Sequence, residues 1–258
     1  MISFKIIRRF SPGFLVLLLI FLGPLSAWSQ KTYFPFVAKD FTAGTWVTIQ
    51  SEDFEGAFPG TSWELIDANN INSPNYLWGK RDCRPHGGQN SGWGVGGGTA
   101  GVGLPCSSDY PSNADSWMIT KEFSLADATD AALIFYLWQN TEPTFDTDTV
   151  CRLASIDNVD FWGTCSFGPS AGWTRTTLDL KNVTTLGNIS HAPRVWIALV
   201  FHSNGSINLA EGAYVDDILL SKCTAIGGCA VAQAASSADS PAQSLLLEKA
   251  AYFRRPSN

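Results

Sequence analysis

Short runs of β-branched and aromatic residues, separated by Gly, Pro, Asn and Asp, recur through the middle of the chain. This pattern is typical of strands joined by turns. The clearest runs are 46–54, 116–120, 132–138, 149–156, 173–180, 195–201 and 214–220. In 132–138 both alternating sets are apolar, as expected of a central strand covered on its two faces. No stretch inside 48–229 keeps a helical period over about 11 residues. The pattern therefore predicts an all-β, two-sheet antiparallel sandwich without internal repeats.

The two ends differ from this middle part. Residues 1–29 read as a cleaved secretory signal, with a basic start (Lys5, Arg8, Arg9), a nine-residue apolar run (14–22) and small residues before Gln30. A membrane anchor is disfavoured, because a bilayer core needs ~20 apolar residues. Residues 30–47 are expected to be a tether, 48–229 the domain, and the Ala/Ser-rich 230–258 a disordered tail. Once the signal is removed, no membrane association is expected.

Six cysteines, at 83, 106, 151, 165, 223 and 229, agree with export. Fifteen pairings are possible. Proximity in sequence favours Cys83–Cys106, Cys151–Cys165 and Cys223–Cys229, each of which closes a short loop. A metal site is the weaker reading, because the chain has no Cys-x-x-Cys pair and no His at ligand spacing. We expect three structural disulfides.

Nine glycines crowd the segment 87–103. A phosphate-binding loop is not predicted there, because no Gly-Lys-Ser/Thr ending and no helix follow. Glycine permits tight turns, so the segment is expected to be a long loop with bulged strand segments, closed off by Cys83–Cys106.

The charge balance excludes several partners. The 258 residues carry a formal net charge of −6, and residues 49–222 alone hold 9 Lys/Arg against 20 Asp/Glu, or −11. A protein that binds duplex nucleic acid needs a basic contact face. Nucleic acid and anionic membrane surfaces are therefore disfavoured, and an extracellular glycan or surface protein is the expected partner.

Three phrases along the domain resemble a known family. They are Ser51-Glu52-Asp53-Phe54-Glu55-Gly56 with Phe58-Pro59-Gly60 and Trp63, then Ala114–Ile119 with the spaced apolar positions of 123–135, and finally Gly212–Ile218. Together they resemble MAM-like jelly-roll domains, of the kind found at the C-terminal end of immune-inhibitor-A-type secreted bacterial metalloproteases. One departure is Asn158, where relatives read Asp-Gly in a hairpin turn. The resemblance implies a non-catalytic jelly-roll accessory module for adhesion, carbohydrate binding or protein binding.

In jelly rolls the first and last strands are commonly neighbours, so Asp53 and Glu55 are expected near Asp216 and Asp217. Asp53 and Glu55 share one strand face, and Asp217 is the preferred partner of the last pair. Asp115 joins them by analogy with related sandwiches. Ca²⁺ takes 6–8 oxygen ligands, which such an edge offers. A structural calcium site is therefore predicted at Asp53, Glu55, Asp115 and Asp217, the alternative being solvated acids at strand ends.

Trp78 and Trp93 are the candidate ligand-binding aromatics, because both lie in loop-like sequence near Arg81, Asp82 and Asn90. An exposed indole beside polar donors can stack against the C–H face of a sugar. Four other tryptophans lie inside strand patterns and are expected in the core: Trp63, Trp117, Trp138 and Trp196.

Catalytic signatures are absent from the sequence. The three histidines, His86, His191 and His202, form no His-Glu-x-x-His array, and no Gly-x-Ser-x-Gly elbow occurs. A glycoside hydrolase on a sandwich fold remains the alternative, with Glu142 and either Asp146 or Asp148 as paired acids. A structural cell-envelope component is a third possibility. The leading hypothesis is a secreted, non-catalytic binding or adhesion module.

Overall fold

The computed structural model describes residues 44–70, 72, 74–143, 148–206, 210–229 and 246–257. The predicted signal (1–29) and most of the tether (30–47) lie outside these residues. Within the described part, no helix is long and apolar enough to cross a membrane.

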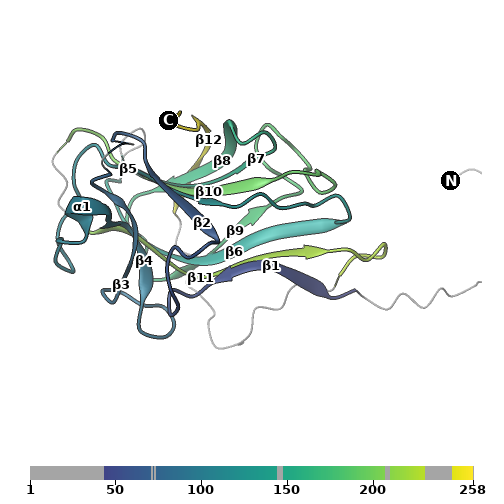
Figure 1. Ribbon diagram of the computed structural model, residues 1–258, viewed down its shortest axis with the longest axis horizontal. Helices are drawn as coiled ribbons and strands as arrows, with labels where there is room; N and C mark the ends of the chain where they lie inside the picture. The colour runs from purple at the N-terminus through teal and green to yellow at the C-terminus, as the bar shows by residue number, and fades with distance from the viewer. Residues whose placement is uncertain are drawn as a thin grey trace, which may run out of the picture. The chain divides into compact units, whose positions relative to one another are not determined.

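Two antiparallel sheets form a sandwich, which confirms the predicted fold class (Figure 1). The first, here called the β6 sheet, has the order β3-β4-β11-β6-β9, and β1 also pairs with β11. Its strands are β1 (Trp46–Glu52), β3 (Leu77–Arg81), β4 (Ser91–Gly97), β6 (Asp130–Asn140), β9 (Thr174–Asp179) and β11 (Gly212–Cys223). A four-residue helix, α1 (Gly98–Gly101), follows β4.

The second sheet, here called the β10 sheet, has the order β12-β8-β7-β10-β5-β2. Its strands are β2 (Trp63–Asp67), β5 (Asp115–Thr120), β7 (Thr149–Ser155), β8 (Asp160–Phe167), β10 (Trp196–His202) and β12 (Leu247–Arg254). The main core lies between the two sheets. A second apolar cluster, which includes Trp117, Phe161 and Val200, lies on the other face of the β10 sheet. Strand β10 is therefore buried on both faces, apart from the partly exposed His202.

Strand β4 lies in the glycine-rich segment that was expected to be a long loop with bulged strand segments, and its glycines have a packing role. A Cβ at Gly92 would stand 2.4 Å from the Phe54 ring, and one at Gly94 would stand 3.0 Å from Phe201. The glycines thus make room for core aromatic rings, while Trp93 and Val95 alternate with them along the strand.

The three disulfides predicted by proximity are confirmed: Cys83–Cys106, Cys151–Cys165 and Cys223–Cys229. Cys151 and Cys165 are directly opposite on β7 and β8. Asn158 has φ 61°, as its place in the hairpin turn requires.

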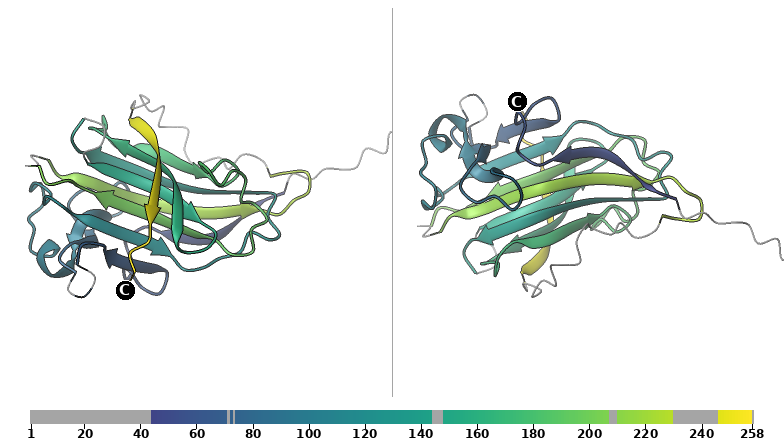
Figure 2. Two further views of the ribbon diagram at one scale, coloured as in Figure 1. Left: turned by 90° about the horizontal axis from the view of Figure 1, so that it is seen from above. Right: turned by 90° about the horizontal axis from the view of Figure 1, so that it is seen from below.

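The prediction of a disordered tail is wrong for its last part. Residues 247–254 form β12, which pairs with β8 over its whole length. Seen from above, β12 (yellow) runs across the outer side of the β10 sheet (Figure 2, left). Ala251 and Phe253 pack on the second apolar cluster, and Arg255 reaches Glu64 on β2. Tertiary packing thus orders, as a strand, the weakly amphipathic end of a tail that was expected to be disordered or at most a short surface helix.

Candidate functional site

The tryptophans predicted to bind ligand are core residues, so this prediction is wrong. Trp78 and Trp93 are both 0% exposed. The indole N–H of Trp78 donates to the Ser116 carbonyl at 3.0 Å, and that of Trp93 to the Glu211 carbonyl at 2.7 Å. Each polar tip is satisfied inside the protein, so neither ring offers a face to a sugar.

Glu55, a predicted metal ligand, instead holds a loop. One carboxylate oxygen accepts the backbone N–H groups of Gln89 and Asn90, both at 2.8 Å. These hydrogen bonds lower the pKa of Glu55. Asp53 stabilises the turn that carries Glu55, because the Asp53 carboxylate accepts the Glu55 N–H at 3.1 Å. We call residues 82–90 the His86 loop.

The middle of the His86 loop is held by Asp216 and Asp217, at the point where β11 changes its neighbouring strand. One edge of β11 pairs with β4 at residues 214–215 and with β1 at 218–223. At the break, the buried Asp216 carboxylate accepts the N–H groups of His86 (2.8 Å) and Gly87 (3.1 Å). Burial raises the pKa of Asp216. Asp217, with φ 48°, turns its carboxylate to His86 Nδ1 at 2.6 Å.

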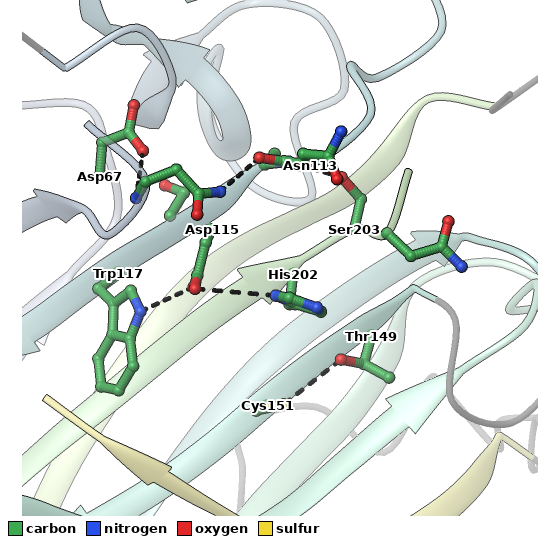
Figure 3. Close-up of polar contacts among 12 residues, drawn as sticks. Asp67, Asn113, Asp115, Trp117, Thr149, Cys151, His202 and Ser203 are labelled. Atoms are coloured by element: carbon green, nitrogen blue, oxygen red, sulfur yellow. Dashed lines mark hydrogen bonds and ion pairs between the residues drawn. The ribbon is translucent and has the colours of Figure 1, made fainter. Parts of the chain in front are cut away.

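Asp115 belongs to the other sheet. Its carboxylate accepts the Trp117 indole N–H at 2.8 Å and lies 3.8 Å from His202 Nδ1 (Figure 3). Asp115 raises the pKa of His202, against the opposing effect of burial. This carboxylate is therefore the partner of a histidine.

The four acids do not form the predicted calcium site. In the described part of the chain, the group of His, Cys, Asp or Glu whose ligand atoms lie within 4.8 Å is Asp82, Cys83 and Cys106. Its two sulfurs form a disulfide and cannot serve as thiolates. Glu55 and Asp217 do border one loop, beside Gly88 and Gly87. Of the four acids, only Glu55 and Asp217 remain predicted calcium ligands.

Three partly exposed aromatic side chains lie on the outer side of the β6 sheet: Tyr136, Trp138 and Trp173. We call them the aromatic face. Seen from below, β11, β6 and β9 run side by side there (Figure 2, right). Tyr136 and Trp138 alternate with buried residues along β6, and Trp173 directly precedes β9, the neighbour of β6. Period-two alternation therefore places them on the outer side of the sheet, where Trp138 and Trp173 also pack against the edge of the main core cluster.

Two residues of the His86 loop lie on these rings. The His86 ring stacks on Tyr136 with centroids 3.6 Å apart, and its edge approaches Trp173 at 5.5 Å. The Arg84 guanidinium lies 3.7 Å from the centre of the Trp138 ring. Stacking and cation–π contact thus fix the rings without covering them fully.

Arg84 and His86 each have an acidic partner. Arg84 forms a two-pronged ion pair with Glu211, whose shorter contact is 2.7 Å. His86 pairs with Asp217. The side chains of both pairs remain 17–39% exposed. The face therefore combines aromatic edges with hydrogen-bond donors and acceptors.

The sequence did not reveal this arrangement. Trp138 was expected in the core because both sets of 132–138 are apolar, and only its partial exposure distinguishes it from Trp63, Trp117 and Trp196, which are buried as predicted. Arg84 and His86 join the face through contacts to residues about 130 positions away. Local sequence patterns do not indicate contacts between residues so far apart in the chain.

The acids of the hydrolase alternative are not arranged as a catalytic pair among the described residues. Asp148 is 0% exposed, and its carboxylate accepts the Tyr110 hydroxyl and the Asn204 N–H. Burial raises its pKa. Glu142 lines a surface hollow that Asp148 does not reach, and Asp146 lies outside the described residues. A pair of acids facing one substrate bond is not formed by Glu142 and Asp148.

No family model and no curated protein match the chain. Among solved structures it is similar to the K1 cleaved adhesin domain of Lys-gingipain from Porphyromonas gingivalis, at 15% identity and TM-score 0.41, over 69% of this chain and 98% of that one. It is also similar to a family 11 carbohydrate-binding module of a Clostridium thermocellum cellulase (15%, TM-score 0.36, 69% and 95%). A third likeness is to an endo-β-1,3-glucanase from Pyrococcus furiosus (10%, TM-score 0.37, 70% and 96%). With TM-scores this low they carry no argument about function, and the MAM-like resemblance stays a prediction.

Proposed function

We propose that the protein is an extracellular, non-catalytic carbohydrate-binding module whose ligand site is the aromatic face. The observation that carries the proposal is the grouping of Tyr136, Trp138 and Trp173 on one outer sheet surface, beside the partly exposed Arg84–Glu211 and His86–Asp217 pairs. Strand β6 holds Tyr136 and Trp138, and Trp173 stands directly before β9, so the backbone positions of the rings are set by the sheet, which lowers the ordering cost of binding.

The chemistry of this face matches a neutral sugar. Sugar rings present C–H faces that pack on aromatic carbon, and their hydroxyls both donate and accept hydrogen bonds. Arg84 and His86 can donate, while Glu211 and Asp217 can accept. The net charge of −6 favours a neutral glycan over a polyanion. Three disulfides are consistent with an oxidising, extracellular location.

Retention on a panel of insoluble polysaccharides and cell-wall preparations tests the proposal. We expect the purified protein to be retained on at least one neutral polysaccharide, and the Trp173→Ala variant to lose most of that retention. Tyr252→Ala is the matched control, because Tyr252 is 47% exposed on the other sheet. Retention of both variants equal to wild type, or no retention of folded wild type on any material, would contradict the proposal.

A further inference from the structure

A second surface feature lies beyond the end of β6, apart from the ion pairs of the aromatic face. It is a hollow of about 360 Å³, lined by Tyr110, Asn140, Thr141, Glu142, Pro143, Pro169 and Ala210. Most of its wall is apolar, from two prolines, an alanine and a tyrosine ring. Among the described residues that line it, Glu142 is the one charged side chain and none is basic.

The walls are fixed by hydrogen bonds from behind. Gln139 is 0% exposed and its amide nitrogen donates to the Gly168 carbonyl at 3.0 Å and to the Thr141 hydroxyl at 3.1 Å. The Gly168 N–H donates to the same hydroxyl at 3.0 Å. These bonds join the segment after β6 to the segment after β8, so the two proline-bearing walls hold their separation.

The opposite wall is equally constrained. The Tyr110 N–H donates to the Ala210 carbonyl at 2.8 Å, and the Tyr110 hydroxyl donates to the buried Asp148. Its ring packs edge-on against Phe201, with centroids 5.3 Å apart. Tyr110 therefore cannot turn its hydroxyl toward a guest, and at 3% exposed its side chain serves to fix the wall.

We propose that this hollow binds a lysine or arginine side chain of a partner protein. Such a side chain combines a flexible apolar stem with a cationic head. The stem suits the exposed prolines Pro143 and Pro169, and the head suits the Glu142 carboxylate. Glu142 accepts a hydrogen bond from the Ser206 hydroxyl at 3.0 Å through one oxygen, and the second oxygen is a further acceptor. The acidic surface attracts a cationic partner at longer range.

A pair of short peptides isolates the role of charge. Acetylated and amidated Gly-Arg-Gly is compared with the same peptide carrying citrulline, which keeps the stem and replaces the guanidinium by a neutral urea. Binding is followed in two-dimensional amide NMR spectra of the full protein. We expect the arginine peptide to shift signals around the hollow and to bind at least about tenfold more tightly than the citrulline peptide.

Two variants locate the effect. Glu142→Gln keeps an acceptor for Ser206 and should weaken the arginine peptide about tenfold or more. Glu122→Gln is the matched control, because Glu122 forms an exposed ion pair with Arg194 on another surface, and its affinity should equal that of wild type. Trp173→Ala should leave peptide binding unchanged, which separates this site from the glycan proposal.

Equal affinity for the arginine and citrulline peptides would overturn the assignment. So would unchanged arginine-peptide binding in a folded Glu142→Gln variant, or no shifts around the hollow at millimolar peptide.

Discussion

At the scale of single residues, carboxylates in this protein chiefly hold backbone segments in place. Glu55 and Asp216 together accept four N–H groups of the His86 loop. A loop that crosses the outside of a sheet has many unpaired donors, and buried donors must find acceptors. These two acids therefore fix where Arg84 and His86 meet the aromatic face.

The contact between His202 and Asp115 should make the stability of the folded protein depend on pH. The folded-state pKa of His202 is raised above its ordinary value of 6.5, so the folded protein binds this proton more tightly than the unfolded chain does. The stabilisation is complete below pH 6.5 and is lost as pH rises through the raised pKa. We expect His202→Gln to lower the melting temperature more below pH 6.5 than at about pH 8.5. Asp115→Asn should remove the same dependence, whereas a pH-independent difference would contradict the assignment.

Replacement of Trp93 and replacement of Trp173 should have opposite effects on stability and on glycan retention. Trp93 is fully buried, so Trp93→Ala should lower the free energy of unfolding by about 3–5 kcal/mol, measured by urea denaturation. Trp173 is partly exposed, and its replacement by Ala should cost far less while reducing glycan retention. Similar losses of stability in the two variants would show that the aromatic face is structural.

At the scale of elements, β12 closes the second apolar cluster. Phe253 meets Trp117 edge-on at 5.9 Å, although their strands are far apart in the sheet order, and Glu248 pairs with Arg152 at 2.7 Å. The β10 sheet therefore curls so that its last strand lies over its own outer face.

Removing this cover should expose apolar surface. Deletion of residues 246–258 should lower the melting temperature and increase binding of a hydrophobic dye, because Trp117 and Phe161 lose their covering strand. Phe253→Ala should lower the free energy of unfolding by about 2 kcal/mol, which is less than the effect of the deletion. Tyr252→Ala, on the exposed side, is the control. An unchanged melting temperature after the deletion would mean that β12 does not cover this cluster.

The elements also show what sequence patterns could and could not predict. Runs rich in β-branched and aromatic residues predicted β5, β6, β7 and β10, because such residues pack well on a pleated surface. The segment around β4 was expected to be a long loop with bulged strand segments, because the sequence does not show that its glycines admit Phe54 and Phe201 from elsewhere in the chain. Strand β12 was missed because Lys249, Ala250 and Ala251 resemble a disordered tail until β8 pairs with them.

The site was less predictable than the fold, for a related reason. The sequence placed Asp53 and Glu55 on the first strand, but β1 ends at Glu52 and both residues lie in the turn that follows it. Glu55 and Asp217 border one loop, beside Gly88 and Gly87. Their partners, however, are N–H groups and His86, and those depend on how the loop folds back across the sheet. Loop-like sequence around Trp93 suggested exposure, yet Glu211 and Tyr214 enclose the ring.

At the scale of the whole molecule, calcium remains a separate prediction that concerns stability. If a calcium ion uses Asp217 with backbone oxygens, Asp217→Ala should lower the melting temperature in calcium but not in chelator. If Asp217 serves only as the partner of His86, the shift should be equal in both conditions. Glu122→Gln, in an exposed ion pair, provides the control for a general charge effect.

The central proposal for the whole molecule is that the β6 sheet of the sandwich carries a sugar-binding face. The most direct test follows the indole N–H signals of the tryptophans by NMR during titration with oligosaccharides from the polysaccharide that retains the protein. We predict that the signals of Trp173 and Trp138 shift with one common affinity, while those of the buried Trp78 and Trp93 stay in place. Saturable binding that leaves Trp173 and Trp138 unmoved would contradict the account.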